Sequence, residues 1–231
     1  MERFWEIDSL RGIAIILMII SNLMTDLIYF NIYGGGIFWK YFAYSVASVF
    51  ILLAGISLTL SYSRASEKSF KKYLKRGLKI FSWGLLITVF TWFFIKDFVI
   101  FGILHFIGIS IILVYPLIKY KLANLAVGIG IILIGIYTIG LRFTFPYLLW
   151  LGFVPSWFYS VDYFPLLPWF GVFLIGIFIG NWAYPNYKRI FNLGERNPKL
   201  LCYLGRHSLF IYLLHQPVIL SILYLSGIVL I

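Results

Sequence analysis

Few side chains in this sequence could carry out chemistry, and a histidine at position 105 is the leading candidate. His105 lies between Gly102 and Gly108 in an otherwise apolar stretch. Free imidazole has a pKa of about 6.5, so much of it is neutral at pH 7 and able to accept a proton. We therefore predict that His105 is a general base. The alternative is a hydrogen bond that joins two helices.

Asn22 and Asp26 are polar residues near the end of a segment composed mainly of Ile, Leu and Met. They are four residues apart and therefore share one face of a helix. Such a pair can bind a hydroxyl or amine of a substrate, or hold its helix to a neighbour. Asp162 precedes a later apolar segment on the same expected side of the membrane. We predict that Asn22, Asp26, His105 and Asp162 converge on one outward-facing pocket.

Two further positions combine polar residues with apolar surroundings. His215 precedes Pro217, which removes one backbone hydrogen bond of a helix, so His215 either bonds the freed backbone or contacts a cofactor. Near the N-terminus, Asp8 or Ser9 can cap a helix, and Asp8 can pair with Arg11 one turn away. The functional alternative is that Arg11 faces an anionic ligand.

The segment from 64 to 81 is strongly basic, and its apolar residues recur at helical spacing. This pattern predicts an amphipathic helix that lies on the inner membrane surface before the third span. Its basic face can bind either anionic lipid or the phosphates of a cofactor. The residues that we assign to a cofactor on this face are Lys71, Lys72, Lys75 and Arg76.

The 231 residues are 62% hydrophobic and only 12% charged, which excludes a soluble globular protein. The apolar residues fall into runs of about 20, enough for a helix to cross the hydrocarbon core. We predict an all-α, polytopic transmembrane helix bundle that forms a single domain over residues 1–231. Its seven spans are expected at about 9–30, 42–62, 78–95, 99–118, 122–140, 164–182 and 203–227.

The net charge of +11 does not indicate nucleic acid, because almost every Lys and Arg lies in the short gaps between apolar runs. With an N-terminus in the cytoplasm, the predicted inner segments are rich in basic residues and the outer ones are poor. The single cysteine excludes an internal disulfide and a thiolate metal site, and no metal is predicted. The absence of a usual signal peptide and of paired cysteines favours a prokaryotic plasma membrane.

Four stretches resemble the membrane acyltransferases of the heparan-alpha-glucosaminide N-acetyltransferase catalytic family and, more distantly, acyltransferase family 3. In chain order they are Ile7–Ile15, Phe101–Gly108, Asp162–Gly171 and Leu204–Pro217. The resemblance implies an enzyme that moves an acyl group from a cytoplasmic acyl-CoA to a glycan or amine acceptor at the outer face. The expected acyl group is acetyl, so the expected donor is acetyl-CoA.

The resemblance also suggests roles for individual residues. Asn22 matches an asparagine of the lysosomal branch and would position the acceptor or stabilise an oxyanion. Relatives commonly carry a catalytic histidine close by, but positions 23–40 contain none, so either His105 is the base or the mechanism differs from that of these relatives. Asp162 or Asp26 would orient the acceptor. The residues assigned to CoA are Arg11, Lys71, Lys72, Lys75, Arg76 and His215.

Two other functions use the same polar groups without acyl transfer. A transporter or flippase would bind a lipid or glycan and leave it unchanged, although no internal repeat is visible. A non-catalytic member of the family would fit the missing histidine. The expected partners are acyl-CoA, the acceptor and membrane lipid, and not nucleic acid; a homodimer and the identity of the acceptor stay open.

The charge pattern predicts that the N-terminus is inside and the C-terminus outside. Only Lys40, Lys96 and Arg142 are assigned to the outer side among the basic residues. A phosphatase reporter fused after Ile231 should therefore be active outside the cytoplasm. A reporter that is active only inside would contradict this topology.

Overall fold

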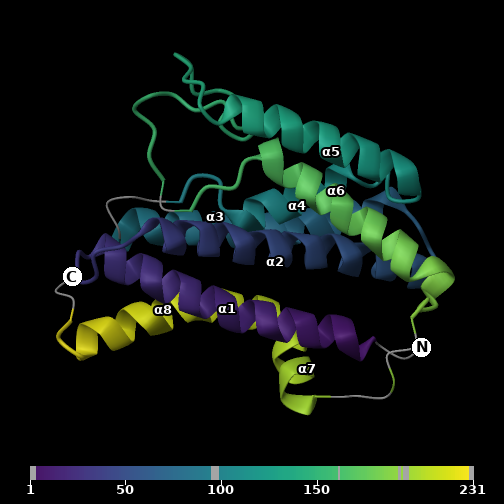
Figure 1. Cartoon of the computed structure of the whole chain (residues 1–231), viewed down its shortest axis with the longest axis horizontal. Coiled ribbons are helices and arrows are strands. Elements are labelled where there is room, and N and C mark those ends of the chain that lie inside the picture. The colour runs from purple at the N-terminus through teal and green to yellow at the C-terminus, as the bar shows by residue number, and fades with distance from the viewer. Residues whose placement is uncertain (1–3, 95–98, 161, 192–193, 195–197, 229–231) are drawn as a thin grey trace. The chain divides into compact units, whose positions relative to one another are not determined.

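The computed structural model describes residues 4–94, 99–160, 162–191, 194 and 198–228, and every regular element in these ranges is helical (Figure 1). Arg3, Lys96 and Arg196, which contributed to the charge pattern, lie outside the described residues. The elements are α1 Trp5–Tyr29, α2 Ile37–Arg64, α3 Phe70–Phe94, α4 Ile103–Leu113, α5 Lys121–Thr138, α6 Leu166–Ala183, the 3-10 turn η1 Pro185–Tyr187, α7 Lys199–Arg206 and α8 Ser208–Leu225.

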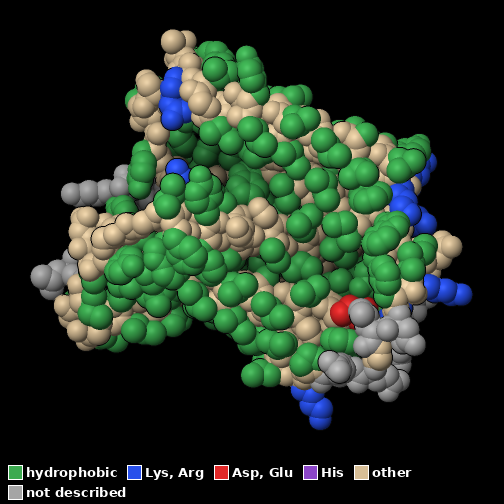
Figure 2. Space-filling view, viewed as in Figure 1, with side chains coloured by type: hydrophobic (Ala, Val, Ile, Leu, Met, Phe, Trp, Pro, Cys, Tyr) green, Lys and Arg blue, Asp and Glu red, His purple; other side chains and the backbone are tan. Residues whose placement is uncertain are grey.

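Five helices in the described part of the chain, α1, α2, α5, α6 and α8, are long and apolar enough to cross a membrane. Their large apolar side chains are exposed, as for Leu133 at 62% and Phe210 at 62%. Hydrophobic side chains are spread over the face seen in Figure 2, with backbone and other side chains between them. Water would oppose such exposure, whereas lipid accepts it. The all-helical membrane architecture is confirmed; the seven spans and their orientation stay predictions.

The predicted span at 99–118 is shorter in the structure. Its helix, α4, has 11 residues and ends at Leu113. Pro116 explains the end, because proline has no backbone N–H to continue the helical hydrogen bonds. At its start, Phe101 instead forms an isolated β-bridge with Tyr163. An 11-residue helix is about 16 Å long, roughly half the hydrocarbon thickness.

Two other boundaries also differ from the prediction. The predicted amphipathic segment and the third span, 78–95, are not separate, because one continuous helix, α3, covers Phe70–Phe94. The predicted last span, 203–227, is divided into α7 and α8 by His207, whose φ of −100° and ψ of 11° are not helical. Apolar periodicity alone did not reveal this break.

The chain forms two compact units. Unit 1 comprises Met1–Leu53 and Asn192–Ile231, and unit 2 comprises Ala54–Phe191. Helix α2 therefore contributes its first part to unit 1 and the rest to unit 2. The single domain expected from the sequence stays a prediction.

In unit 1, α1 contacts both α7 and α8 (Figure 1). The approach of α7 requires glycine, since a side-chain carbon at Gly12 would collide with the backbone of Leu201, and one at Gly205 with that of Asp8. Farther along α1, Ile15 and Met18 are buried against Val46 of α2. Beyond them, Ile219 and Leu223 of α8 form a second apolar cluster. Unit 1 thus fixes how α1 meets the C-terminal segment.

In unit 2, α5 packs along α6, and α3 along α4 (Figure 1). The α3–α4 contact also depends on glycine: a side-chain carbon at Gly108 would lie 2.8 Å from both Gly77 O and Phe81 N. Phe106 and Phe173 pack edge to face between α4 and α6. Close helix packing of this kind is usual in membrane bundles, where small residues let backbones approach.

We predict that Gly108→Ala destabilises the protein by about 1–3 kcal/mol, because the added methyl group meets backbone atoms that cannot move aside. Gly130→Ala is the matched control, since no atom lies within 4 Å of a side-chain carbon at that helical position. Thermal unfolding in detergent should show a lower midpoint for the first variant and an equal or higher one for the second. Equal midpoints for wild type and Gly108→Ala would contradict the packing described.

Candidate active site

Helices α1 and α8 carry a group of facing polar side chains, Asn22, Asp26, His215 and Gln216, which we name the α1–α8 cluster. Asn22 Nδ2 lies 2.6 Å from His215 Nε2 and 3.1 Å from Met18 Sδ. His215 is only 8% exposed. These contacts place an imidazole and an amide side by side within helices that are otherwise apolar.

The surroundings of His215 determine which of its nitrogens carries the proton. Nδ1 faces the backbone carbonyl of Tyr212. A carbonyl oxygen can only accept, so Nδ1 must donate its hydrogen there. In the neutral ring Nε2 then has a free electron pair, which accepts a hydrogen bond from the amide of Asn22. His215 thus bonds backbone, but at the carbonyl of Tyr212 and not at that of Leu213, which is the one that Pro217 leaves without a helical donor. A contact of His215 with a cofactor stays a prediction.

Asp26 and Gln216 form the second contact of the α1–α8 cluster, one turn of α1 beyond Asn22. Gln216 Nε2 donates to both carboxylate oxygens, at 2.9 and 3.0 Å. Asp26 is buried, at 7% exposure, so this hydrogen-bond donor offsets part of the cost of removing the carboxyl group from water. Sequence reasoning correctly placed Asn22 and Asp26 on one face but did not identify Gln216 as a partner.

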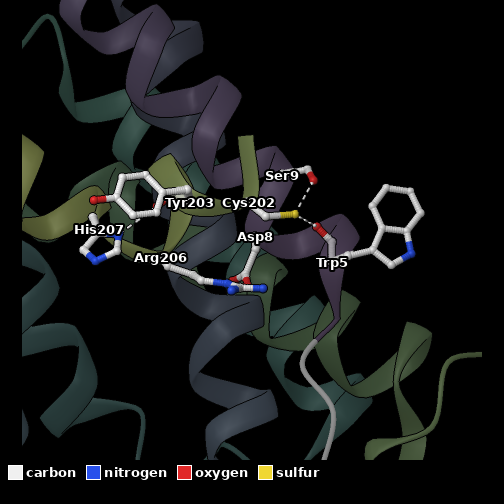
Figure 3. Close-up of polar contacts among 7 residues, drawn as sticks. All are labelled: Trp5, Asp8, Ser9, Cys202, Tyr203, Arg206 and His207. Atoms are coloured by element: carbon white, nitrogen blue, oxygen red, sulfur yellow. Dashed lines mark hydrogen bonds and ion pairs between the residues drawn. The ribbon is translucent and has the colours of Figure 1, made fainter. Parts of the chain in front are cut away.

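The start of α1 meets α7 through a separate group of contacts (Figure 3). Asp8 Oδ2 pairs with Arg206 Nε at 3.0 Å, so its partner is not Arg11 as the sequence suggested. Neither Asp8 nor Ser9 caps the helix, because α1 begins at Trp5 and its N-cap is Phe4. Ser9 instead contacts the thiol of Cys202 at 3.2 Å. The predicted cap was wrong because the helix starts one turn earlier, and the predicted local ion pair was wrong because α7 brings Arg206 to Asp8.

Arg11 reaches the start of α8. Its Nη2 donates to Ser208 Oγ at 2.8 Å, and Ser208 is almost fully buried. Arg11 thus joins α1 to α8 at one end, as the α1–α8 cluster joins them farther along. A role for Arg11 toward an anionic ligand stays a prediction.

In unit 2, His105 is 2% exposed at the start of α4. The backbone N–H of Gly102 donates to His105 Nδ1 at 3.2 Å, and Nε2 lies 3.5 Å from Thr88 Oγ1. Its ring lies between Phe81 and Phe101, with ring centroids at 5.0 and 5.8 Å. Nδ1 therefore accepts a hydrogen bond from the backbone at the start of α4, as a helix-capping side chain does. The catalytic role of His105 stays a prediction.

Asp162 contacts the same helix start. Its Oδ2 accepts from the backbone N–H of Ile103 at 3.4 Å, and its carboxylate fills the space that a side chain at Gly102 would need. Burial raises the pKa of Asp162 from 3.8 to about 6, while the bond from Ile103 opposes this rise. His105 and Asp162 thus lie at one helix end in unit 2, whereas Asn22 and Asp26 belong to unit 1. Their convergence on one pocket stays a prediction.

The basic residues assigned to a cofactor lie in the first two turns of α3. Lys71, Lys72 and Lys75 are exposed, whereas Tyr73 between them is buried. Arg76 Nη1 donates to Ser61 Oγ of α2 at 3.1 Å. Of the predicted apolar face, Tyr73 is buried, but Phe70 and Leu78 are 45% and 50% exposed, so the division into an apolar and a basic face stays a prediction. The three exposed lysines can approach an anion.

We predict a pH-dependent difference between the wild-type protein and Asp162→Asn. From pH 3.8 to about 6 the folded state holds a proton that the unfolded state releases, so wild-type stability falls as the pH rises. The asparagine side chain of the variant cannot ionise, so the stability of the variant does not fall in this way. Its free energy of unfolding relative to wild type should rise by up to roughly 1.4 kcal/mol per pH unit in this window. Parallel unfolding profiles from pH 4 to 7 would contradict the raised pKa.

Comparison with known proteins agrees with these observations. The model of the heparan-alpha-glucosaminide N-acetyltransferase catalytic family matches residues 3–217. No curated protein and no solved structure matches the chain significantly. The family match includes the α1–α8 cluster and the start of α4, and it ends within α8. The chain therefore belongs to the heparan-alpha-glucosaminide N-acetyltransferase catalytic family.

Proposed function

We propose that this chain is a membrane acetyltransferase that moves an acetyl group from cytoplasmic acetyl-CoA to an amine or hydroxyl of a glycan at the outer face. The observation that carries the proposal is the α1–α8 cluster, in which Asn22 contacts His215 inside helices that suit a membrane. Family membership supports transferase chemistry in general. The donor, the acceptor and the sides of the membrane are our proposal.

Polar groups at membrane depth favour a chemical role because their insertion is costly. Apolar clusters and glycine contacts already join the C-terminal segment to α1. The association of α1 with α8 therefore does not require the four polar side chains of the α1–α8 cluster. The amide of Asn22 can donate to an oxyanion, and the carboxyl group of Asp26 can accept from a hydroxyl or amine. Acyl transfer uses both abilities.

The exposed lysines of α3 support binding of the donor. Coenzyme A carries several phosphate charges, and Lys71, Lys72 and Lys75 are exposed in the same turns of α3 in which Tyr73 is buried. The positive-inside pattern favours a cytoplasmic location for this end of α3. The proposed setting is a prokaryotic plasma membrane, with the N-terminus inside and about seven crossings.

We predict that the purified full chain in lipid nanodiscs releases free CoA from acetyl-CoA when methyl α-glucosaminide is supplied as an acceptor probe. A thiol reagent measures the CoA, and the one cysteine, Cys202, is buried and adds little background. Acetylated probe should appear in equal amount by mass spectrometry. A chain that binds acetyl-CoA but never cleaves the thioester would contradict the proposal and favour a transporter or a non-catalytic member.

The same assay tests the lysines. Replacing Lys71, Lys72 and Lys75 together by Gln should raise the KM for acetyl-CoA about tenfold or more, because charge-assisted contacts to phosphate are lost. Lys119→Gln with Lys121→Gln is the matched control, since both residues are exposed and basic but lie just before and at the start of α5. An unchanged KM in the triple variant would assign the three lysines to lipid.

A further inference from the structure

The two buried histidines of the described chain use their ring nitrogens in opposite ways. At His105, Nδ1 accepts from the backbone N–H of Gly102. At His215, Nδ1 faces a backbone carbonyl and Nε2 faces the side chain of Asn22. The electron pair that could take a proton therefore points at backbone in His105 and at a side chain in His215.

This difference decides which ring can take a proton. Protonation of His105 Nδ1 would break its bond with Gly102 and leave a buried N–H without a partner, which is costly. Protonation of His215 Nε2 leaves the bond to Tyr212 intact, because Nδ1 already donates there. It requires only that the amide of Asn22 moves aside or turns its oxygen toward the new N–H.

We infer that His215, and not His105, is the proton acceptor of this chain, and that Asn22 is the positioning residue that holds the His215 ring with Nε2 unprotonated until the acceptor group replaces the Asn22 amide at that nitrogen. The inference rests on the proposed function and names its base. Asp26 and Gln216 support it, because their contact fixes the rotation of α8 that brings His215 onto α1.

The proton and electron balance is complete with these groups. The acceptor amine or hydroxyl attacks the thioester carbonyl and its proton passes to His215 Nε2, which gives a tetrahedral oxyanion and an imidazolium. When the oxyanion collapses, the C–S bond breaks and the thiolate of CoA takes the proton back from Nε2. The products are the acetylated acceptor and free CoA, and His215 returns to its starting form.

The kinetic test compares single variants of the full chain in nanodiscs, with acetyl-CoA and methyl α-glucosaminide as probes. His215→Ala should lower kcat by about 10²- to 10⁴-fold with little change in the KM for acetyl-CoA, and added imidazole should restore part of the rate. Asn22→Ala should lower kcat less and without rescue by imidazole. His207→Ala is the matched control, because this exposed histidine lies in the same segment and its ring contacts Tyr203.

The outcomes separate this inference from the proposed function. An active wild type with a fully active His215→Ala variant would overturn the inference and leave the acetyltransferase proposal intact. The inference also fails if His105→Ala loses turnover while it still unfolds at the wild-type temperature and His215→Ala stays active. A wild type that never releases CoA would contradict the proposed function, and the inference with it.

A second measurement does not depend on turnover. In protein labelled with 15N-histidine, the His215 signals, identified by their loss in His215→Gln, should show a protonated Nδ1 and an unprotonated Nε2. Asn22→Leu should shift the Nε2 signal because its hydrogen-bond donor is gone. The opposite tautomer at His215 would overturn the inference even in an active enzyme.

Discussion

The hydrogen bond between Asn22 and His215 is the interaction on which the arrangement of unit 1 depends. A membrane offers no water to either side chain, so each must find its partner within the protein. His215 and Gln216 are adjacent, whereas Asn22 and Asp26 are one helical turn apart, and both contacts form at once. A shift or rotation of α8 along α1 would break both, so this pair of contacts selects one register.

Steric contacts enforce the same register toward the start of α1. Gly12 and Gly205 bring α1 and α7 so close that any side chain would meet backbone. The ion pair of Asp8 with Arg206 and the bond of Arg11 to Ser208 add polar contacts at this end. Contacts thus fix the C-terminal segment against α1 at both ends, and the ring of His215 has little freedom to move. A fixed position suits a group that must meet a reacting atom.

The comparison of His105 with His215 shows why residue type alone is a weak guide to chemistry. Gly102 and Gly108 flank His105 in the sequence, but in the structure Phe81 and Phe101 occupy the sides of its ring and Gly84 accommodates it from α3. Pro217 suggested a structural task for His215, yet only one of its nitrogens bonds backbone. The partner of each nitrogen, and not the neighbours in sequence, distinguishes the two rings.

Composition and local motifs determined the membrane class, the helical architecture and the family, because each depends on short segments read one at a time. Helix ends were less predictable, since the N-terminal start of α1 and the break at His207 depend on contacts with other segments. Only the tertiary structure paired Asn22 with His215, 193 residues away, and Asp8 with Arg206 instead of Arg11. Helical periodicity tells which residues share a face, but it leaves open how two helices rotate and slide against each other, and that choice determines every partner.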